Sequence, residues 1–416
     1  MKSVPEGRRA ILEAASSLLM PADANKKGVL VEAGEAWNLD ALRAAAATAE
    51  VVLWGRAPSA QASVTGAIVG ALRRELAIRR IKQAGPSGLR VRNVYRVPPP
   101  LLRAGLARTM LGKALLAGAL VEMASNAGPE RVLDVALRAA GATGLVSHFQ
   151  VGSGGGLLIH AQVNGAPALI RVGTQRGARE IARAADALQF IARSNMGRIP
   201  RLLIRGETHG AVWSVESLLP GRRPRRLRRR TLREVADFCG ALPPTEGAPE
   251  APAEDFGLMS RYLPQFSQPL TTIMRRVKEE FGHVRGVMRH GDLWAGNLLI
   301  RDGSLAGVVD WDAWHPSGAP GTDLLYTTVT DQWLRSRRRL GEIWRSRPWL
   351  SAAYAEAGTS YWRGLDILPS AELLEAVGLS AWAAQVATTL DRSPQLASNP
   401  LWVHNTVGAV IKGLGY

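Results

Sequence analysis

The chain has a single cysteine, Cys239, among its 416 residues. Intramolecular disulfides and cysteine-built metal sites are therefore excluded, and this favours a reducing compartment such as the cytoplasm. A membrane-spanning helix needs roughly 20 apolar residues, whereas the clean apolar run of the basic N-terminal third covers only 114–121. Glu13 interrupts the apolar residues after Arg8 and Arg9, unlike a secretory signal peptide. We expect a cytoplasmic protein without a membrane span.

Lysine is also scarce. Only 7 of the 52 basic residues are lysine, so the other 45 are arginine, and 35 acidic residues leave a formal net charge of +17. Such an excess favours an anionic partner: a phosphate ligand, a nucleic acid or an acidic surface. It argues against a polycationic ligand unless there is a local acidic pocket. Candidates for such a pocket are Glu246, Glu250, Glu254 and Asp255.

With 46% hydrophobic and 21% charged residues, the composition is that of a globular protein with two or three cores. Residues 1–128 alternate short apolar runs with helical patterns, which predicts an α/β region. We expect strands at 28–32, 51–54 and 89–97, and helices at 38–47, 62–84 and 101–125. The region lacks the glycine fingerprint of a dinucleotide site, so we expect a structural or substrate-side appendage.

Residues 129–220 have a different pattern. A helix at 132–140 ends at Gly141, and a glycine-rich segment, 152–156, joins two apolar strand patterns. Asn164-Gly165 is the preferred dipeptide of a type I′ hairpin and predicts a third strand after it. A helix at 176–193 and a hairpin of 201–204 with 211–216 follow. This order resembles the N-terminal lobe of a kinase, and the rest of the chain, 221–416, is mostly helical in pattern.

One segment carries the chemistry. His290-Gly291-Asp292 is followed by Asn297, a turn at Asp302-Gly303, and a second aspartate, Asp310, at a strand end. This spacing brings two carboxylates and an amide around one small space. Phosphoryl transfer needs such a set: one carboxylate orients the attacking hydroxyl and accepts its proton, and oxygen ligands hold magnesium on the nucleotide phosphates.

The segment from His290 to Asp323 resembles the motif of the aminoglycoside phosphotransferase and choline kinase-like family, and the similarity extends from about Leu133 to the C-terminus. The resemblance implies an α+β, protein-kinase-like two-lobe fold, with a β-rich N-lobe at 129–220 and a helical C-lobe at 221–416. It also implies a small-molecule kinase. The enzyme would transfer phosphate from ATP, or another nucleoside triphosphate, to a hydroxyl of a sugar, an antibiotic or an envelope precursor.

The same resemblance assigns roles within the segment. Asp292 would be the catalytic base, His290 would support the catalytic loop, and Asn297 and Asp310 would bind Mg²⁺. Asp323 would fix the geometry of the C-lobe rather than touch substrate. Asp312 stays open: it either assists metal or substrate, or binds backbone.

The N-lobe residues are less specific. The backbone amides of Gly152, Ser153, Gly154, Gly155 and Gly156 either approach nucleotide phosphates or form a flexible turn. No lysine occurs between Lys113 and Lys278, so we expect Arg171 to replace the kinase lysine.

We expect Glu180, on the next helix, to pair with Arg171, although it could instead be a solvated helix residue. Backbone groups around Glu216, Ser217 and Leu218 would meet the adenine at a hinge, where the side chains need not matter.

Two alternatives remain. Without the lysine and with a loose glycine loop, the chain could be a catalytically impaired nucleotide-binding or scaffold protein of the same fold. The arginine runs at 222–230 and 335–339 could bind nucleic acid. Neither run is interleaved with aromatic residues that would stack on bases, so a solvated face or an anionic small-molecule substrate fits them better.

Overall fold

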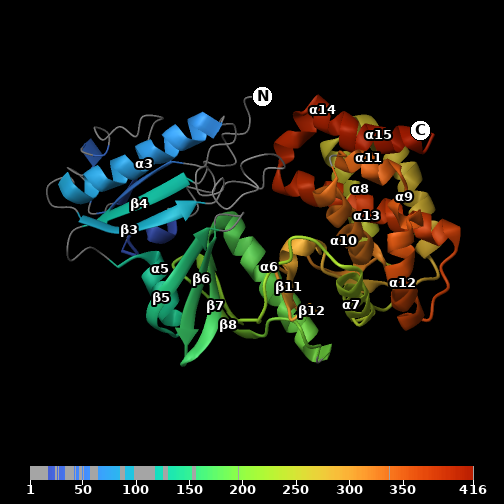
Figure 1. The fold of residues 1–416 in the computed structure, drawn as a ribbon, viewed down its shortest axis with the longest axis horizontal. Helices are drawn as coiled ribbons and strands as arrows, with labels where there is room; N and C mark the ends of the chain where they lie inside the picture. Colours follow the sequence, from blue (N-terminus) through green and yellow to red (C-terminus); the bar gives the residue numbers. More distant parts are fainter. Residues whose placement is uncertain are drawn as a thin grey trace. The chain divides into compact units, whose positions relative to one another are not determined.

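The computed structural model describes residues 17–23, 26, 28–32, 42, 44–45, 49, 51–56, 64–84, 90–97, 118–124, 130–151, 156–194, 196–336 and 338–415. They form two compact units (Figure 1). The first comprises residues 1–182 and 202–218, and the second comprises 183–201 and 219–416.

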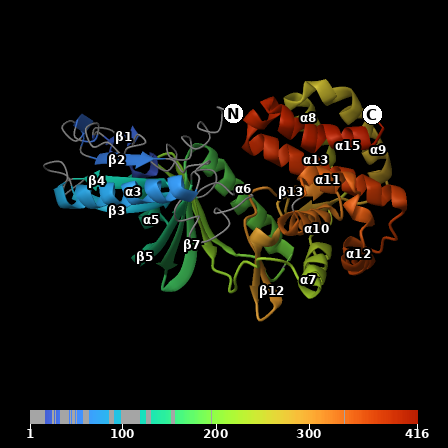
Figure 2. The same ribbon diagram turned by 45° about the horizontal axis from the view of Figure 1, so that its top comes forward.

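The first unit contains a four-stranded sheet in the order β1-β2-β4-β3. Its strands are β1 (Gly28–Glu32), β2 (Val51–Arg56), β3 (Arg90–Val97) and β4 (Gly118–Ala124). β1 and β2 are parallel, whereas β4 is antiparallel to both of its neighbours. Helix α3 (Val64–Ala84) runs alongside β3 and β4 (Figures 1 and 2). The predicted elements at 28–32, 51–54, 62–84 and 89–97 are therefore confirmed.

The helix predicted over 101–125 is wrong at its C-terminal end, because Gly118–Ala124 forms the strand β4. β4 pairs with β2 on one side and with β3 on the other. Pairing at both edges outweighs the helix propensity of its alanine, leucine and methionine residues. Residues 101–117 lie outside the described part of the chain, as does most of the helix predicted at 38–47.

The first unit also contains an antiparallel five-stranded sheet in the order β5-β6-β7-β9-β8. Its strands are β5 (Ala142–Val151), β6 (Leu157–Val163), β7 (Ala166–Gly173), β8 (Leu202–Thr208) and β9 (Ala211–Ser217). Asn164 and Gly165 have φ values of 51° and 77°, the left-handed pair that a type I′ turn requires, so the predicted hairpin is confirmed.

One buried cluster joins the two sheets. Leu18, Val51 and Leu53 of the N-terminal part share it with Leu133 of α5 (Val132–Ala139) and Ile159 of β6. The N-terminal region is thus packed into the same compact unit as the five-stranded sheet. The proposed division at residue 128 reflects a change in sequence pattern. The first compact unit spans it, since it covers residues 1–182 together with 202–218.

The second unit is mainly helical. Its helices are α7 (Arg229–Gly240), α8 (Ala251–Tyr262), α9 (Ser267–Phe281), α10 (Thr322–Arg335), α11 (Leu340–Arg345), α12 (Ala352–Gly364), α13 (Ala371–Arg392), α14 (Pro400–Val403) and α15 (Ala409–Gly413). Two short antiparallel pairs lie among them, namely β10 (Val287–Arg289) with β13 (His315–Gly318) and β11 (Leu298–Arg301) with β12 (Ser304–Val308). Helix α6 (Gln175–Ile191) begins in the first unit and ends in the second.

Helix α13 is the core helix of this unit and packs against α8, α9 and α10. It is long and apolar enough to cross a membrane by length and composition, and no other helix of the described ranges meets that test. However, 72% of its apolar window is buried inside the protein. Burial against the neighbouring helices therefore accounts for its apolar sequence.

Candidate active site

The loop that carries the predicted base leaves β10 at Arg289 and continues through His290, Gly291 and Asp292. Gly291 has a φ of 80°, and a Cβ atom there would overlap the carbonyl oxygen of Ala313. Only glycine fits this conformation and this close approach without strain. The loop is thereby held against the segment that follows Asp310.

Asp323, in the first turn of α10, fixes the start of the loop. Its Oδ2 accepts a hydrogen bond from the backbone N–H of His290 at 2.5 Å, and its Oδ1 accepts one from Gly291 at 3.0 Å. The His290 ring is fully buried, with Nδ1 accepting from the N–H of Asp292 at 3.3 Å. Nε2 therefore carries the proton and donates to the carbonyl oxygen of Val309 at 3.0 Å. These contacts support the positioning roles predicted for His290 and Asp323.

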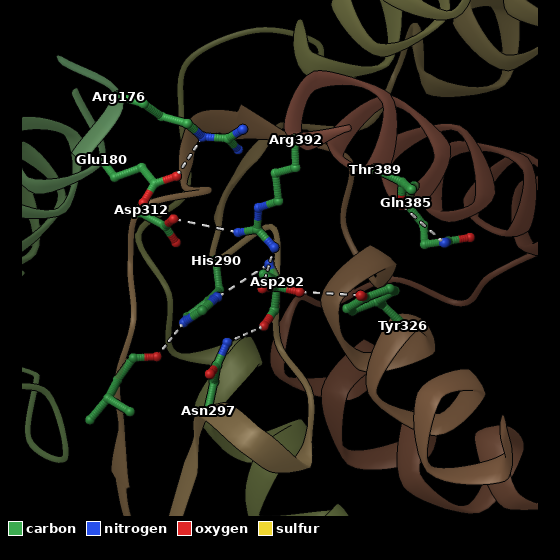
Figure 3. A network of polar contacts seen from close by, with 11 residues as sticks. Arg176, Glu180, His290, Asp292, Asn297, Asp312, Tyr326, Gln385, Thr389 and Arg392 are labelled. Carbon is green, nitrogen blue, oxygen red and sulfur yellow. Dashed lines mark hydrogen bonds and ion pairs between the residues drawn. The ribbon is translucent and has the colours of Figure 1, made fainter. Parts of the chain in front are cut away.

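Asp292 is 8% exposed and is held by two side chains that the sequence did not indicate (Figure 3). The hydroxyl of Tyr326, on α10, donates to Oδ1 at 3.2 Å. The guanidinium of Arg392, at the end of α13, contacts Oδ2 through Nη1 at 3.0 Å. Its Nη2 lies 3.4 Å from Oδ2 of Asp312. Arg392 thus bridges Asp292 and Asp312, and no local pattern marks a residue 100 positions downstream of the aspartate that it binds.

Burial and the neighbouring carboxylates together keep the Tyr326 hydroxyl protonated and the Arg392 guanidinium charged. Burial raises the pKa of the Tyr326 phenol well above its usual value, and the charge of Asp292 acts in the same direction, so the hydroxyl stays protonated and donates. Burial alone would lower the pKa of Arg392, but the carboxylates of Asp292 and Asp312 outweigh it and raise the pKa. Arg392 therefore keeps its charge at every physiological pH.

Asn297 and Asp310 are brought together by the β11–β12 hairpin. Asn297 is 4% exposed, and its Nδ2 donates to the backbone oxygen of Asp292 at 2.8 Å. This bond uses the amide nitrogen, so the amide oxygen can coordinate a cation. The N–H of Val309 donates to the carbonyl of Asn297 at 2.9 Å, which places Asp310 beside it. Asp310 has a left-handed φ of 71°, a conformation that costs about 1–3 kcal/mol and clusters at functional sites.

In the first unit, Arg171 lies on β7 and is 9% exposed. It forms an ion pair with Glu216 on β9, with Nε and Oε1 2.9 Å apart. The register places Arg171 opposite Ser214, so Glu216 is its diagonal neighbour on the same face of the sheet. Oε1 of Glu216 also accepts from the hydroxyl of Ser214 at 3.4 Å.

The predicted pairing of Glu180 with Arg171 is therefore wrong. Glu180 pairs with Arg176 one turn earlier on α6, at 2.9 Å (Figure 3). The neighbouring strand β9, and not the next helix, supplies the carboxylate that pairs with Arg171. A signal in the sequence is an acidic residue, Glu216, within a short strand pattern, and the structure buries it to 2% exposure.

The other predicted N-lobe residues are only partly described. Gly152, Ser153, Gly154 and Gly155 lie outside the described residues. Gly156 comes just before β6, where a Cβ atom would lie 3.2 Å from the carbonyl oxygen of Val172. Leu218 follows β9 and its side chain is 39% exposed. The role of the backbone around Glu216, Ser217 and Leu218 at a hinge stays a prediction.

Comparison with known proteins gives the family. The model of the phosphotransferase enzyme family (APH) matches residues 160–368, half of the chain. The match contains Arg171, Glu216 and the whole segment from His290 to Asp323. The chain belongs to this family. This confirms the resemblance, the kinase-like α+β fold and the enzyme class predicted from the sequence.

The phosphotransferase is also similar in fold to solved structures. A thermostable mutant of aminoglycoside phosphotransferase APH(4)-Ia, in a ternary complex with ADP and hygromycin B, is 16% identical with a TM-score of 0.45, over 67% of this chain and 97% of that chain. Aminoglycoside-3′-phosphotransferase of type VIII is 20% identical with a TM-score of 0.38, over 59% and 97%. APH(3″)-Id from Streptomyces rimosus is 16% identical with a TM-score of 0.39, over 60% and 96%. A comparison with curated protein sequences gave no match.

The donor atoms of the phosphotransferase fit magnesium. Among the described residues there is no cluster of three or more His, Cys, Asp or Glu side chains that would form a ready-made metal cage. Asn297, Asp310 and Asp312 offer amide and carboxylate oxygens, the hard ligands that Mg²⁺ prefers. Mg²⁺ takes few protein ligands and completes its shell with water and phosphate oxygens. The set therefore fits a magnesium ion that is bound together with phosphates.

Replacing Asp323 with alanine is expected to destabilise the phosphotransferase rather than only slow it. The substitution leaves the N–H groups of His290 and Gly291 without their acceptor in a site where Asp323 is 7% exposed. At about 1–3 kcal/mol for each buried unsatisfied donor, the free energy of unfolding should fall by about 2–6 kcal/mol. Denaturant unfolding measures this, with the exposed Asp237 of α7 as the matched Asp→Ala control. Equal stability of the two variants would contradict the positioning role.

Proposed function

We propose that this phosphotransferase transfers the terminal phosphoryl group of ATP, with Mg²⁺, to a hydroxyl of a small molecule, and that Asp292 is the catalytic base. One observation carries the proposal. Nδ2 of Asn297 donates directly to the backbone oxygen of Asp292. The His290 ring links the backbone N–H of Asp292 to the carbonyl oxygen of Val309, the residue before Asp310. These bonds support a site in which a proton acceptor and two oxygen ligands lie side by side, as phosphoryl transfer requires.

Each residue has a defined task in this proposal. The Asp292 carboxylate orients the acceptor hydroxyl and accepts its proton. Asn297 and Asp310 would hold the magnesium ion, which when bound neutralises charge on the phosphates. Arg171, whose guanidinium is kept in place by Glu216, supplies a permanent cation for nucleotide phosphate oxygens. Backbone amides of 152–156 for phosphate and backbone groups around Glu216, Ser217 and Leu218 for adenine complete the proposed nucleotide contacts.

The acceptor is proposed to be a sugar, an antibiotic or an envelope precursor. The net charge of +17 favours an anionic acceptor over a polycationic one. The free, buried Cys239 agrees with a cytoplasmic location, where ATP is available.

A second candidate function is nucleotide binding without transfer. It is favoured by the contacts of Tyr326 and Arg392 with both carboxylate oxygens of Asp292, since a base must offer one oxygen to its substrate. ATP consumption against a panel of sugars, antibiotics, hydroxy acids and sugar phosphates separates the two functions. Transfer to any hydroxyl supports the kinase, whereas magnesium-dependent ATP binding with no transfer across the panel supports the alternative.

The metal assignment has its own test. Asp310→Asn should weaken magnesium-dependent nucleotide binding by about tenfold or more, because even outer-shell partners of metal sites contribute about 10- to 100-fold. Asparagine tolerates the left-handed φ of 71° at this position, so the backbone should be kept. The matched control is Asp302→Asn, another left-handed aspartate (φ 53°), with a 91% exposed side chain in the turn of the same hairpin. ATP is titrated with and without Mg²⁺, and an unchanged magnesium dependence in Asp310→Asn would remove this residue from the metal site.

A further inference from the structure

Arg392 has no role in the function proposed so far. It is the last residue of α13 and lies beyond residue 368, where the family match ends. Its two terminal nitrogens nevertheless contact the predicted base and a carboxylate of the predicted metal side, at 3.0 Å and 3.4 Å (Figure 3). We propose that Arg392 binds the phosphoryl group during its transfer, an inference that rests on the proposed function.

Arg392 lies between the predicted base and the predicted metal side. In phosphoryl transfer the acceptor hydroxyl is at the base, and the phosphate oxygens are held at the metal ligands. The group in transfer therefore passes from the metal side to the base side. Asp292 marks one side, and Asp312, two residues after Asp310, marks the other. A guanidinium that bridges these two carboxylates occupies the path between them.

The guanidinium of Arg392 can exchange carboxylate oxygens for phosphoryl oxygens. Its planar fork binds two oxygens of a carboxylate or of a phosphoryl group in the same geometry. The side chain of Arg392 is 32% exposed, whereas those of Asp292 and Asp312 are 12% and 10% exposed. An incoming phosphoryl group can thus reach the guanidinium and replace the carboxylate oxygens as its ligands. A guanidinium keeps its charge at every physiological pH.

The exchange also prepares the base. Once the fork turns to phosphoryl oxygens, Oδ2 of Asp292 is released, while the hydroxyl of Tyr326 keeps Oδ1 in place. The acceptor O–H bond then breaks, its proton goes to Oδ2, and the oxygen forms a bond to the γ-phosphorus. The bond from that phosphorus to the β,γ-bridging oxygen breaks, and the electron pair leaves with ADP. Arg392 forms no covalent bond and stabilises the charge on the equatorial phosphoryl oxygens.

The test uses ADP and fluoroaluminate, which together with Mg²⁺ mimic the phosphoryl group in transfer and need no acceptor. Wild type should bind ADP much more tightly when fluoroaluminate is present. In Arg392→Ala this gain in ADP affinity should be smaller by on the order of 10²- to 10³-fold, the effect of removing one transition-state donor. Arg392→Lys keeps the charge without the fork and should lose part of it. Affinity for ADP alone should stay within a few-fold of wild type in both variants.

A purely structural role for Arg392 predicts instead that its variants lose affinity for ADP alone and keep the gain from fluoroaluminate. The matched control is Arg276→Ala, which removes an arginine paired at 2.9 Å with Glu375 near the start of the same helix and should keep the full gain. If Arg392→Ala does not fold, Arg392→Lys decides. The inference is overturned if a folded Arg392 variant keeps the full gain in ADP affinity that fluoroaluminate gives. It is also overturned if wild type binds ADP with no such gain. Wild type that binds no magnesium nucleotide at all instead overturns the proposed function on which the inference rests.

Discussion

Asp292→Ala should abolish phosphoryl transfer to any acceptor while the affinity for ATP stays within a few-fold of wild type. A positioned general base contributes about 10²- to 10⁴-fold to turnover. Because the base acts on the acceptor hydroxyl, its loss should appear in turnover and not in ATP binding. Initial rates of transfer and direct ATP titration measure the two quantities separately.

The contacts of Asp292 require a second variant. Alanine leaves the Tyr326 hydroxyl without its acceptor and leaves Arg392 with Asp312, so a part of any loss could come from altered loop structure. Asp292→Asn keeps the shape and the Oδ1 acceptor but removes the basic carboxylate. Both variants should be inactive, and the exposed Asp237→Ala should match wild type. Wild-type turnover in a folded Asp292→Asn would show that this residue is not the base.

Local features of the fold were predictable because short segments determine them. Asn164-Gly165 predicts its turn from two residues that adopt left-handed φ values. In the same way, His290, Asp292, Asn297 and Asp310 lie within one stretch of chain that a single hairpin folds back on itself. Their proximity follows from chain connectivity, so the sequence was sufficient.

Features that depend on distant pairing were not predictable. Gly118–Ala124 has the composition of a helix and becomes a strand only because β2 and β3 offer it two edges. Glu216 binds Arg171 because the sheet register sets β9 beside β7, and Arg392 reaches Asp292 because α13 ends there. In each case the partner is chosen by tertiary packing, which one sequence does not reveal.

The Arg171–Glu216 pair gives the second large expected effect. Arg171→Ala should lower ATP affinity and turnover by on the order of 10²-fold, because it removes the cation that we propose binds the nucleotide phosphate oxygens. Arg171→Lys keeps the charge but loses the planar fork, so its loss should be smaller. ATP titration and turnover of the three proteins test this order. Wild-type values for Arg171→Ala would mean that the phosphotransferase does not use this strand residue for its nucleotide.

Glutamate variants then separate the observed partner from the one that the sequence suggested. Glu216→Gln leaves the 11% exposed Arg171 side chain without its carboxylate, and breaking a buried pair costs about 3–5 kcal/mol. It should therefore lower the free energy of unfolding and weaken ATP binding by misplacing the cation. Glu180→Gln breaks only a helix pair with the 35% exposed Arg176, worth about 0.3–0.5 kcal/mol, and should leave both quantities near wild type. Larger losses in Glu180→Gln than in Glu216→Gln would mean that the helix, and not the strand, positions the arginine.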